Sequence, residues 1–486
     1  MFGRKIKIVS TLALPLFAVG CVSTDYAAKD AGFLNASLKA GEATGKQTVW
    51  VQNQQHAQVV RDRVKTLMAK KTVDVETAVQ VALLNNKGLQ AAYADLGDSA
   101  ADAWQTQLSV FPTFSVGLSG IGTPGLEAYR VLEGAIAANI LALATYDKNI
   151  RLAETRFRQA QLNAALATIS LAADTRRAWI NAVAAWENVS YLNQGRAAAE
   201  AASDLTKRLG EAGSMPKGDQ AREHVFYAEL TGETAKARLE ARLAKEELIR
   251  LMGLSGSDIE FQIPNRLPSL PKALIKRNDI EAEAIHKRMD LQVARLELQA
   301  LAQTYKLDDV TRFVTDIELV GTVERERERE DDGIVSEVSK SASLEFAIPI
   351  FDSGQARLRK AELAYMRAAN QLAELAVNVR SEARSSYQAY RSNYDIARHY
   401  RNSVLPLRNA IEEQSLLTYN GMLTSTFELI ADSREKINSA LLAVNAKRDF
   451  WLAEANLAPA IYGGSAGAAS GETEVASAEE AESGGH

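Results

Sequence analysis

The stretch 147–209 contains no proline and a single glycine, Gly195. Its apolar residues recur at spacings of four and three, as in Leu162, Leu166, Ile169 and then Trp179, Val183, Trp186. This spacing is typical of the buried stripe of an α-helix. An unbroken helix over this range is roughly 95 Å long, which exceeds the needs of a globular domain. We therefore predict that it packs against similar helices in a bundle or coiled coil.

The stretch 352–420 has the same character, with Tyr387, Tyr390 and Tyr394 on one helix face. Pro406 lies inside it. Because proline lacks an N–H donor and clashes with the preceding turn, we predict a kink at this position.

The two halves of the chain resemble each other, which indicates an internal repeat. Each half is predicted to run helix, strand, strand, long helix, turn, helix. The aligned pairs are 82–96 with 284–298, 144–147 with 349–352, and 211–219 with 419–427.

These alignments define the expected domains. The first repeat covers 72–252 and the second 272–460. A connector rich in Gly, Ser and Pro, 253–271, joins them. The tail 461–486 is of low complexity, with five Glu and no basic residue, and is expected to be disordered.

The N-terminus has the features of an export signal. A basic start precedes an apolar run of secretory length and small residues, so residues 1–20 are predicted to be a signal peptide. The sole cysteine, Cys21, follows it and resembles a bacterial lipoprotein cleavage site. A covalent lipid on Cys21 would anchor the extension 21–71 to a membrane. A signal peptide followed by an incidental cysteine is the alternative.

Composition and motifs exclude several classes of function. A net charge of -5 argues against a nucleic-acid partner. After the N-terminus, no stretch is apolar enough for a membrane-spanning helix. The five histidines are scattered without ligand spacing, and no nucleophile or phosphate-binding motif occurs. We therefore expect no catalytic residue, no metal site and no cofactor beyond the lipid on Cys21.

Four short segments alternate between apolar and polar residues: 108–121, 132–144 (less clearly), 313–323 and 338–348. Such segments fit a transmembrane β-barrel with a wet lumen. A half-buried sheet in a soluble α+β domain would alternate in the same way. The export signal and the long helices favour the barrel. Since eight strands are the usual minimum, several protomers must contribute.

With these residues in view, the chain resembles the TolC-type outer-membrane efflux proteins. The motifs that carry the resemblance are "TAVQVALLNNKGLQAA", "DLQVARLELQAL", "IPIFDSGQARLRKAELAY" and the segment from "VLPLRNAIEEQ" to "NSALLAV". The resemblance covers about 72–460. It implies a mainly α fold with a β-barrel part. Four strands from each subunit of a homotrimer would form a 12-stranded barrel in the outer membrane. Long antiparallel coiled-coil helices would form a trimeric α-barrel in the periplasm.

The resemblance also implies a function and its partners. Proteins of this kind are passive exit ducts, docked through a periplasmic adaptor protein onto an inner-membrane pump. An outer-membrane channel of a type I protein secretion system has the same architecture and stays an alternative. A lipid-anchored periplasmic coiled-coil scaffold is a further alternative.

By the same resemblance, the turns 210–219 and 420–427 form the periplasmic gate and the adaptor-docking surface. Gly213, Asp219 and Gly421 lie in these turns, and Asp219 falls where relatives carry a gate-linking Asp. Its expected partner is Arg222, or Arg434 of a neighbouring subunit. Phe427 and Ile430 occupy positions where the best-known relative has a double ring of Asp. Glu428 and Asp432 are therefore the nearest carboxylates available for a constriction.

The run "ERERERED" at 324–331 follows the third alternating segment. As a helix it would place like charges at i,i+4, which is unfavourable. As a strand it sorts by face, with Glu324 on the polar face and Arg325, Arg327 and Arg329 on the apolar face. We predict a strand that emerges at the extracellular rim, with the arginines near lipid phosphates. A mobile charged loop is the alternative for its outermost residues.

Overall fold

The computed structural model describes residues 26–69, 72–122, 126, 129–277, 279–314, 316–330, 333–347, 353–421 and 423–464. Cys21, the predicted signal peptide 1–20 and nearly all of the predicted tail lie outside the described residues.

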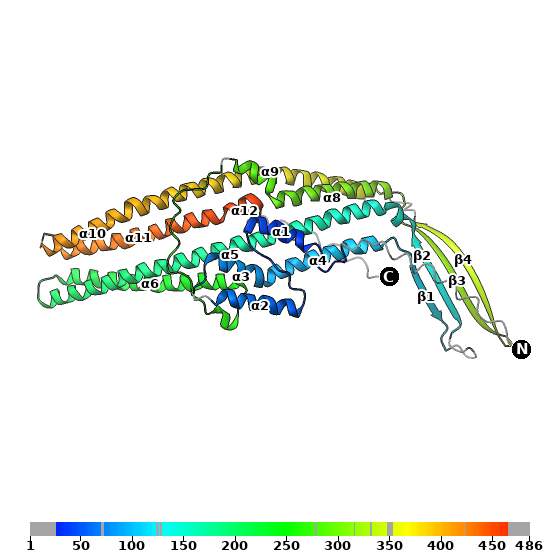
Figure 1. Cartoon of the computed structure of the whole chain (residues 1–486), viewed down its shortest axis with the longest axis horizontal. Helices are drawn as coiled ribbons and strands as arrows, with labels where there is room; N and C mark the ends of the chain where they lie inside the picture. The colour runs from blue at the N-terminus through cyan, green and yellow to red at the C-terminus, as the bar shows by residue number, and fades with distance from the viewer. Residues whose placement is uncertain are drawn as a thin grey trace. The chain divides into compact units, whose positions relative to one another are not determined.

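The described chain is mainly helical, with four strands (Figure 1). In chain order the elements are α1 (Phe33–Thr44), α2 (Gln54–Met68), α3 (Val75–Asn85), α4 (Lys87–Leu108), β1 (Thr113–Ser119), β2 (Val131–Asn139), α5 (Ile140–Glu211), α6 (Lys217–Met252), η2 (Gly256–Ile259), α7 (Ile280–Lys287), α8 (Met289–Thr311), β3 (Asp316–Glu330), β4 (Gly333–Ala347), α9 (Gln355–His399), η3 (Tyr400–Val404), α10 (Leu405–Asn420), α11 (Thr426–Ala455) and α12 (Leu457–Tyr462).

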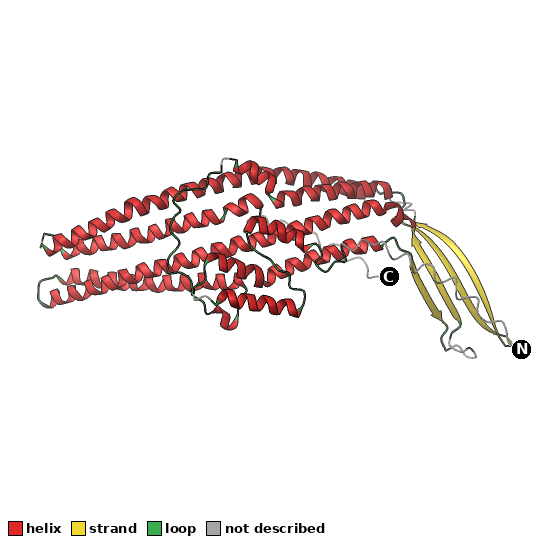
Figure 2. Cartoon of the chain, in the orientation of Figure 1, coloured by secondary structure: helices red, strands yellow, loops and turns green. Residues whose placement is uncertain are grey.

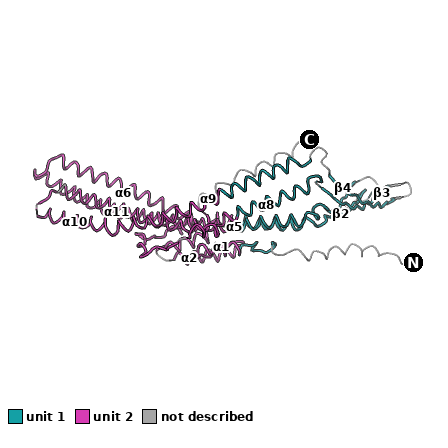
Figure 3. The backbone as a smooth tube through the Cα atoms, turned by 90° about the horizontal axis from the view of Figure 1, so that it is seen from above, with its two compact units in different colours: residues 1–34, 94–161, 293–373 teal, residues 35–93, 162–292, 374–486 magenta. Residues whose placement is uncertain are grey.

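The chain divides into two compact units (Figure 3). Unit 1 comprises 1–34, 94–161 and 293–373 and contains the sheet. Unit 2 comprises 35–93, 162–292 and 374–486 and contains both helical turns predicted as a gate.

The predicted long helix is α5, which has 72 residues. Leu162, Ile169, Trp179 and Val183 of the predicted stripe are buried. The indole N–H of Trp179 donates to the carbonyl of Val73 at 3.0 Å, so the ring is fixed in the core with its polar atom satisfied.

The tyrosine face of α9 is also confirmed. Tyr390 and Tyr394 are buried in unit 2, with ring centroids 5.5 and 5.6 Å from that of Phe450 in α11. A π-helical turn, Tyr400–Val404, interrupts the helix just before Pro406, which lies at the start of α10. Pro406 has no backbone N–H and cannot donate the usual helical hydrogen bond. The wider π-helical turn absorbs this irregularity, so the helix continues into α10.

The four strands form one antiparallel sheet in the order β1–β2–β3–β4 (Figure 1). Directly paired residues project from the same face of a sheet. One such row runs from Leu118 through Leu132 and Arg325 to Val338. The register therefore assigns each residue of the four strands to a face.

Several predicted strand boundaries were wrong, and β3 begins at Asp316 and not at 313, while β4 begins at Gly333 and not at 338. Residue 108 belongs to the last turn of α4, and the backbone N–H of Phe111 still bonds to its carbonyl. The second strand ends at Asn139 and not at 144, because the Asn139 side chain accepts the N–H of Ala142 at 2.6 Å and begins α5.

Candidate functional site

The sheet has one face made almost entirely of apolar side chains, which we call the apolar face. Most of its large members are exposed in the described chain, whereas Leu132 and Ile317 are half-buried. The exposed ones include Phe114, Val116, Leu118, Ile136, Leu319, Val323, Val338, Leu344 and Phe346. A continuous exposed patch of this kind marks an interaction surface or a lipid contact.

The opposite face, the acidic face, carries carboxylates among small polar residues, alanines and a few valines. Its acidic residues on the three strands β2 to β4 are Glu133, Asp316, Glu318, Glu324, Glu326, Glu328, Glu337 and Glu345. Glu133 lies opposite Glu324, Glu318 opposite Glu345, and Glu326 opposite Glu337. Like charges in such pairs destabilise a sheet. Their repetition indicates that this face needs to be charged and wet.

Within unit 1, neither face of the sheet is covered by a helix (Figure 2). The strands β1 and β4 pair on one side only within this sheet. An open edge is a template for further strand pairing. Both faces of the sheet and its two edge strands are thus available for contacts beyond this chain.

Residues 324–330 of the charged run are part of β3, as predicted, and Glu330 pairs with Gly333 across the hairpin. Glu324 lies on the acidic face, whereas Arg325, Arg327 and Arg329 occupy the register of the apolar face. The guanidinium of Arg327 lies 4.4 Å from the ring centre of Tyr129. The charges are therefore sorted by face along an extended strand.

In unit 2, α5 and α6 form one helical hairpin, and α10 and α11 form a second. The first turn, 212–216, lies within the predicted range. The N–H of Ser214 bonds to Leu209 at 2.8 Å and that of Gly213 to Gly210 at 3.0 Å. This pattern requires a left-handed residue, and Gly213 has φ +75°.

The second turn, 421–425, also lies within the predicted range. Gly421 has an ordinary φ of -78°. Ser425 accepts the backbone N–H of Glu428, and the Glu428 carboxylate accepts the hydroxyl of Thr424. Asp432 accepts the hydroxyl of Ser415 on α10. Both carboxylates predicted for a constriction thus make hydrogen bonds within their own hairpin.

Asp219 lies in the first turn of α6 and pairs with Arg222 at 2.8 Å, one of its two expected partners. Together with residues of both hairpins, it borders a hollow of about 630 Å³. The hollow is lined by Thr206, Ser214, Met215, Pro216, Asp219, Glu223, Tyr419, Asn420, Thr424, Ser425 and Ile430. The structure therefore brings the two turns together around one space.

An ion pair that sequence reasoning missed crosses from one hairpin to the other. Arg434, the second expected partner of Asp219, lies 3.6 Å from Glu223 of the same chain. Its guanidinium also lies 3.6 Å from the ring centre of Phe226. Glu223 is only 4% exposed, and its Oε2 accepts no hydrogen bond among the described groups. Glu223 lies one helical turn after Asp219, but nothing in the sequence connects it with Arg434.

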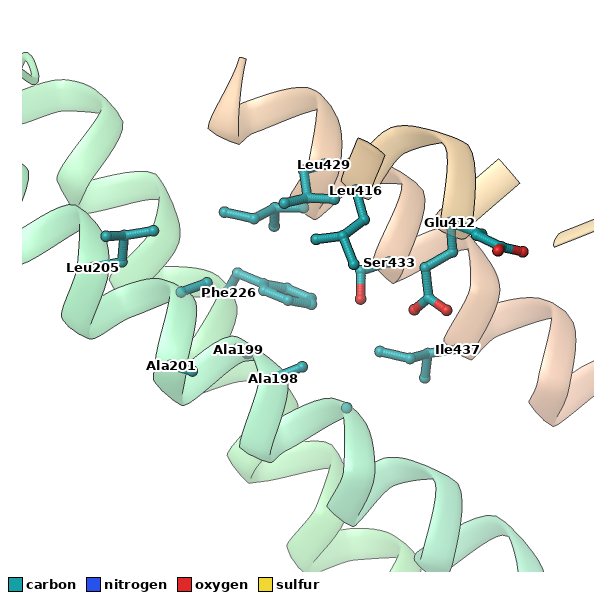
Figure 4. A pocket seen from close by; sticks show the side chains of 14 residues that line it. Ala198, Ala199, Ala201, Leu205, Phe226, Glu412, Leu416, Leu429, Ser433 and Ile437 are labelled. Carbon is teal, nitrogen blue, oxygen red and sulfur yellow. The ribbon is translucent and has the colours of Figure 1, made fainter. Parts of the chain in front are cut away.

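Next to this pair the hairpins enclose an apolar groove of about 530 Å³ (Figure 4). Alanines of α5, including Ala198 and Ala199, face Leu416, Leu429 and Ile437 of the other hairpin. The groove closes at Gly195, where an added Cβ would lie 2.6 Å from Ile437. The two hairpins are therefore closely packed at Gly195 and loosely packed toward their turns.

The fold matches solved outer-membrane channels. The chain is similar to the CmeC outer membrane channel of Campylobacter jejuni, with a TM-score of 0.69 and 17% identity over 80% of this chain and 86% of that one. It is also similar to a membrane protein from Pseudomonas aeruginosa, with a TM-score of 0.68 and 17% identity over 82% of this chain and 95% of that one. For the outer membrane protein VceC of Vibrio cholerae, the TM-score is 0.65 and the identity 14% over 80% of this chain and 96% of that one. The predicted resemblance is confirmed for the fold.

No protein-family model matches the chain, and no curated protein matches it either. Within the described ranges, the helices all lack an apolar stretch of the length that crosses a bilayer. The same ranges contain no group of three or more His, Cys, Asp or Glu placed to hold one metal ion.

Proposed function

We propose that this protein is the outer-membrane exit duct of a tripartite efflux system. It conducts substrates passively from an inner-membrane pump and a periplasmic adaptor to the exterior. A duct of this kind performs no chemistry of its own, so it requires no catalytic residue.

The four-stranded sheet carries the proposal. Its apolar face suits hydrocarbon, its acidic face suits a water-filled lumen, and its edges β1 and β4 suit pairing with other copies. Because four strands are too few to close, we propose a homotrimer with 12 strands. Three copies of the long helices would continue the duct as an α-barrel.

The order of elements supports the proposed duplication. The run α3, α4, β1, β2, α5, α6 recurs as α7, α8, β3, β4, α9 with α10, and α11. Each copy supplies one strand pair and one helical hairpin. The hairpin turns with Gly213 and Gly421 form the proposed gate and adaptor-docking surface, and a lipid on Cys21 is the proposed anchor.

The proposal is tested by purifying the full chain from membranes, measuring its oligomeric mass and recording currents in planar bilayers. A trimer with discrete conductance steps is the expected result. A monomer that needs no detergent and carries no current would rule the duct out.

A further inference from the structure

The apolar face changes character where β3 and β4 approach their hairpin. Nearest the helices, the paired rows Ile317–Phe346 and Leu319–Leu344 are apolar. Toward the hairpin, Lys340 lies opposite Val323, and Arg325 and Arg327 follow at the next two positions of this face. We call Lys340, Arg325 and Arg327 the basic band.

The basic band adjoins apolar residues of the neighbouring strands. Arg325 shares its row with Leu118, Leu132 and Val338. Barrel strands tilt by roughly 35–45°, so a membrane surface crosses them diagonally and not along one row. The basic band runs obliquely in this way, from Lys340 on β4 to Arg325 and Arg327 on β3 nearer the hairpin, while Val338 of β4 stays apolar.

The strand places the side chain of Arg325 on the face opposite to its neighbouring carboxylates. Glu324 and Glu326 flank Arg325 in sequence but project from the acidic face. Arg325 is exposed, and its guanidinium donates to the hydroxyl of Ser336 at 3.3 Å. Within the described chain, neither Arg325 nor Lys340 forms an ion pair with a carboxylate. Opposite charges paired across the strands would have stabilised the sheet more.

An aromatic contact holds part of the band in place. Arg327 lies over the ring of Tyr129, and its backbone N–H donates to the carbonyl of Arg130 at 2.8 Å. Arg130 itself pairs with Glu326 on the acidic face at 3.2 Å. Tyrosine is enriched at the level of lipid headgroups, where one end of the ring is apolar and the other wet.

We propose that the basic band binds the phosphate groups of outer-leaflet lipid headgroups. The arginine fork matches phosphate oxygens in a bidentate geometry, and the adjoining apolar face lies against the acyl chains. Lys340 extends its stem along apolar surface toward the same headgroups. This inference rests on the proposed membrane-spanning function and names the lipid that the barrel selects.

The test uses the full chain in detergent with added lipid A. Binding of diphosphorylated lipid A and of its dephosphorylated form is measured by native mass spectrometry, and inorganic phosphate is tested separately. The wild type should bind the phosphorylated lipid about tenfold more tightly than the dephosphorylated one. The variant R325Q/R327Q should lose this preference, and R325K/R327K should keep most of it.

The matched control, K236Q/R242Q, removes two exposed positive charges from α6 and should keep the full preference. Equal binding of both lipids by the wild type, or an unchanged preference in R325Q/R327Q, would overturn the inference. So would saturation by inorganic phosphate alone. Conductance in planar bilayers is recorded for every variant. If the wild type conducts but shows no preference for the phosphorylated lipid, only the lipid-binding role of the basic band is refuted. If the wild type does not conduct, the proposed function is refuted.

Discussion

Glu223 of α6 and Arg434 of α11 lie 3.6 Å apart and form an ion pair between the two helical hairpins of unit 2. Asp219, by contrast, pairs with Arg222 of its own helix. This link between the hairpins, which was not predicted, therefore lies one helical turn further along α6 than Asp219. Glu223 lines the hollow at the turns, and Phe226, which Arg434 also contacts, lines the apolar groove.

Replacing Arg434 by Gln is expected to favour the open state of the proposed gate. Removing one partner leaves the buried Glu223 charge without its counter-ion. Because the Arg434 side chain is 36% exposed, we take the contribution of the ion pair to hairpin packing as only about 1 kcal/mol. Its loss should shift the equilibrium toward separated hairpins by roughly fivefold. Single-channel recordings should show a higher open fraction.

Arg222→Gln is the matched control, since it breaks an ion pair of the same chemistry that stays within α6. Its open fraction should equal that of the wild type. If both variants open the channel equally, the gate responds to lost charge at the tip and not to the link between hairpins.

Gly213→Ala is expected to lower the thermal stability. Its φ of +75° costs an L-residue about 1 kcal/mol, although an added Cβ would meet no neighbouring atom within 4 Å. Gly218→Ala, also in open space but in the first turn of α6, should raise stability by about 0.5–1 kcal/mol. Thermal unfolding of the two variants should therefore shift in opposite directions.

Leu344→Lys tests which face of the sheet contacts lipid. If Leu344 faces hydrocarbon near the midplane, the charge costs about 2–4 kcal/mol and lowers the assembled fraction in the outer membrane. Ser343→Lys, the neighbouring residue on the acidic face, should assemble normally. Equal assembly of both variants would favour a sheet that does not span the membrane.

Much of the fold was predictable because the sequence patterns that specify its helices and strands involve residues close together in the chain. The apolar stripe of α5 and the alternation in β3 and β4 are periodic over many residues, so single exceptions such as Lys340 do not hide them. The charged run could be assigned to a strand because a helix would stack its like charges.

The missed features depend on individual side chains or on distant partners. One hydrogen bond from Asn139 decides where β2 ends and α5 begins, and alternation cannot reveal it. Glu223 and Arg434 are far apart in the chain and meet only when the hairpins pack. Neither belongs to a motif, so the sequence offered no reason to join them.

Tyr93→Phe should change the stability of unit 2 at alkaline pH. Burial raises the pKa of Tyr93 from 10.0 to about 12, although its hydroxyl bonds to that of Thr168 at 2.8 Å. A raised folded-state pKa gives stability that is complete below about pH 10 and is lost as the pH rises toward 12. The shift corresponds to roughly 3 kcal/mol.

The phenylalanine variant lacks this ionisation, so its unfolding free energy should fall less steeply than that of the wild type between pH 10 and about 12. At neutral pH it should be about 1 kcal/mol less stable, because it lacks the hydrogen bond to Thr168. Tyr305→Phe, at an exposed position, controls for the loss of a hydroxyl. Parallel curves for Tyr93→Phe and the wild type would show that Tyr93 ionises without unfolding its surroundings, and the core around α4 and α5 would then be looser than its burial indicates.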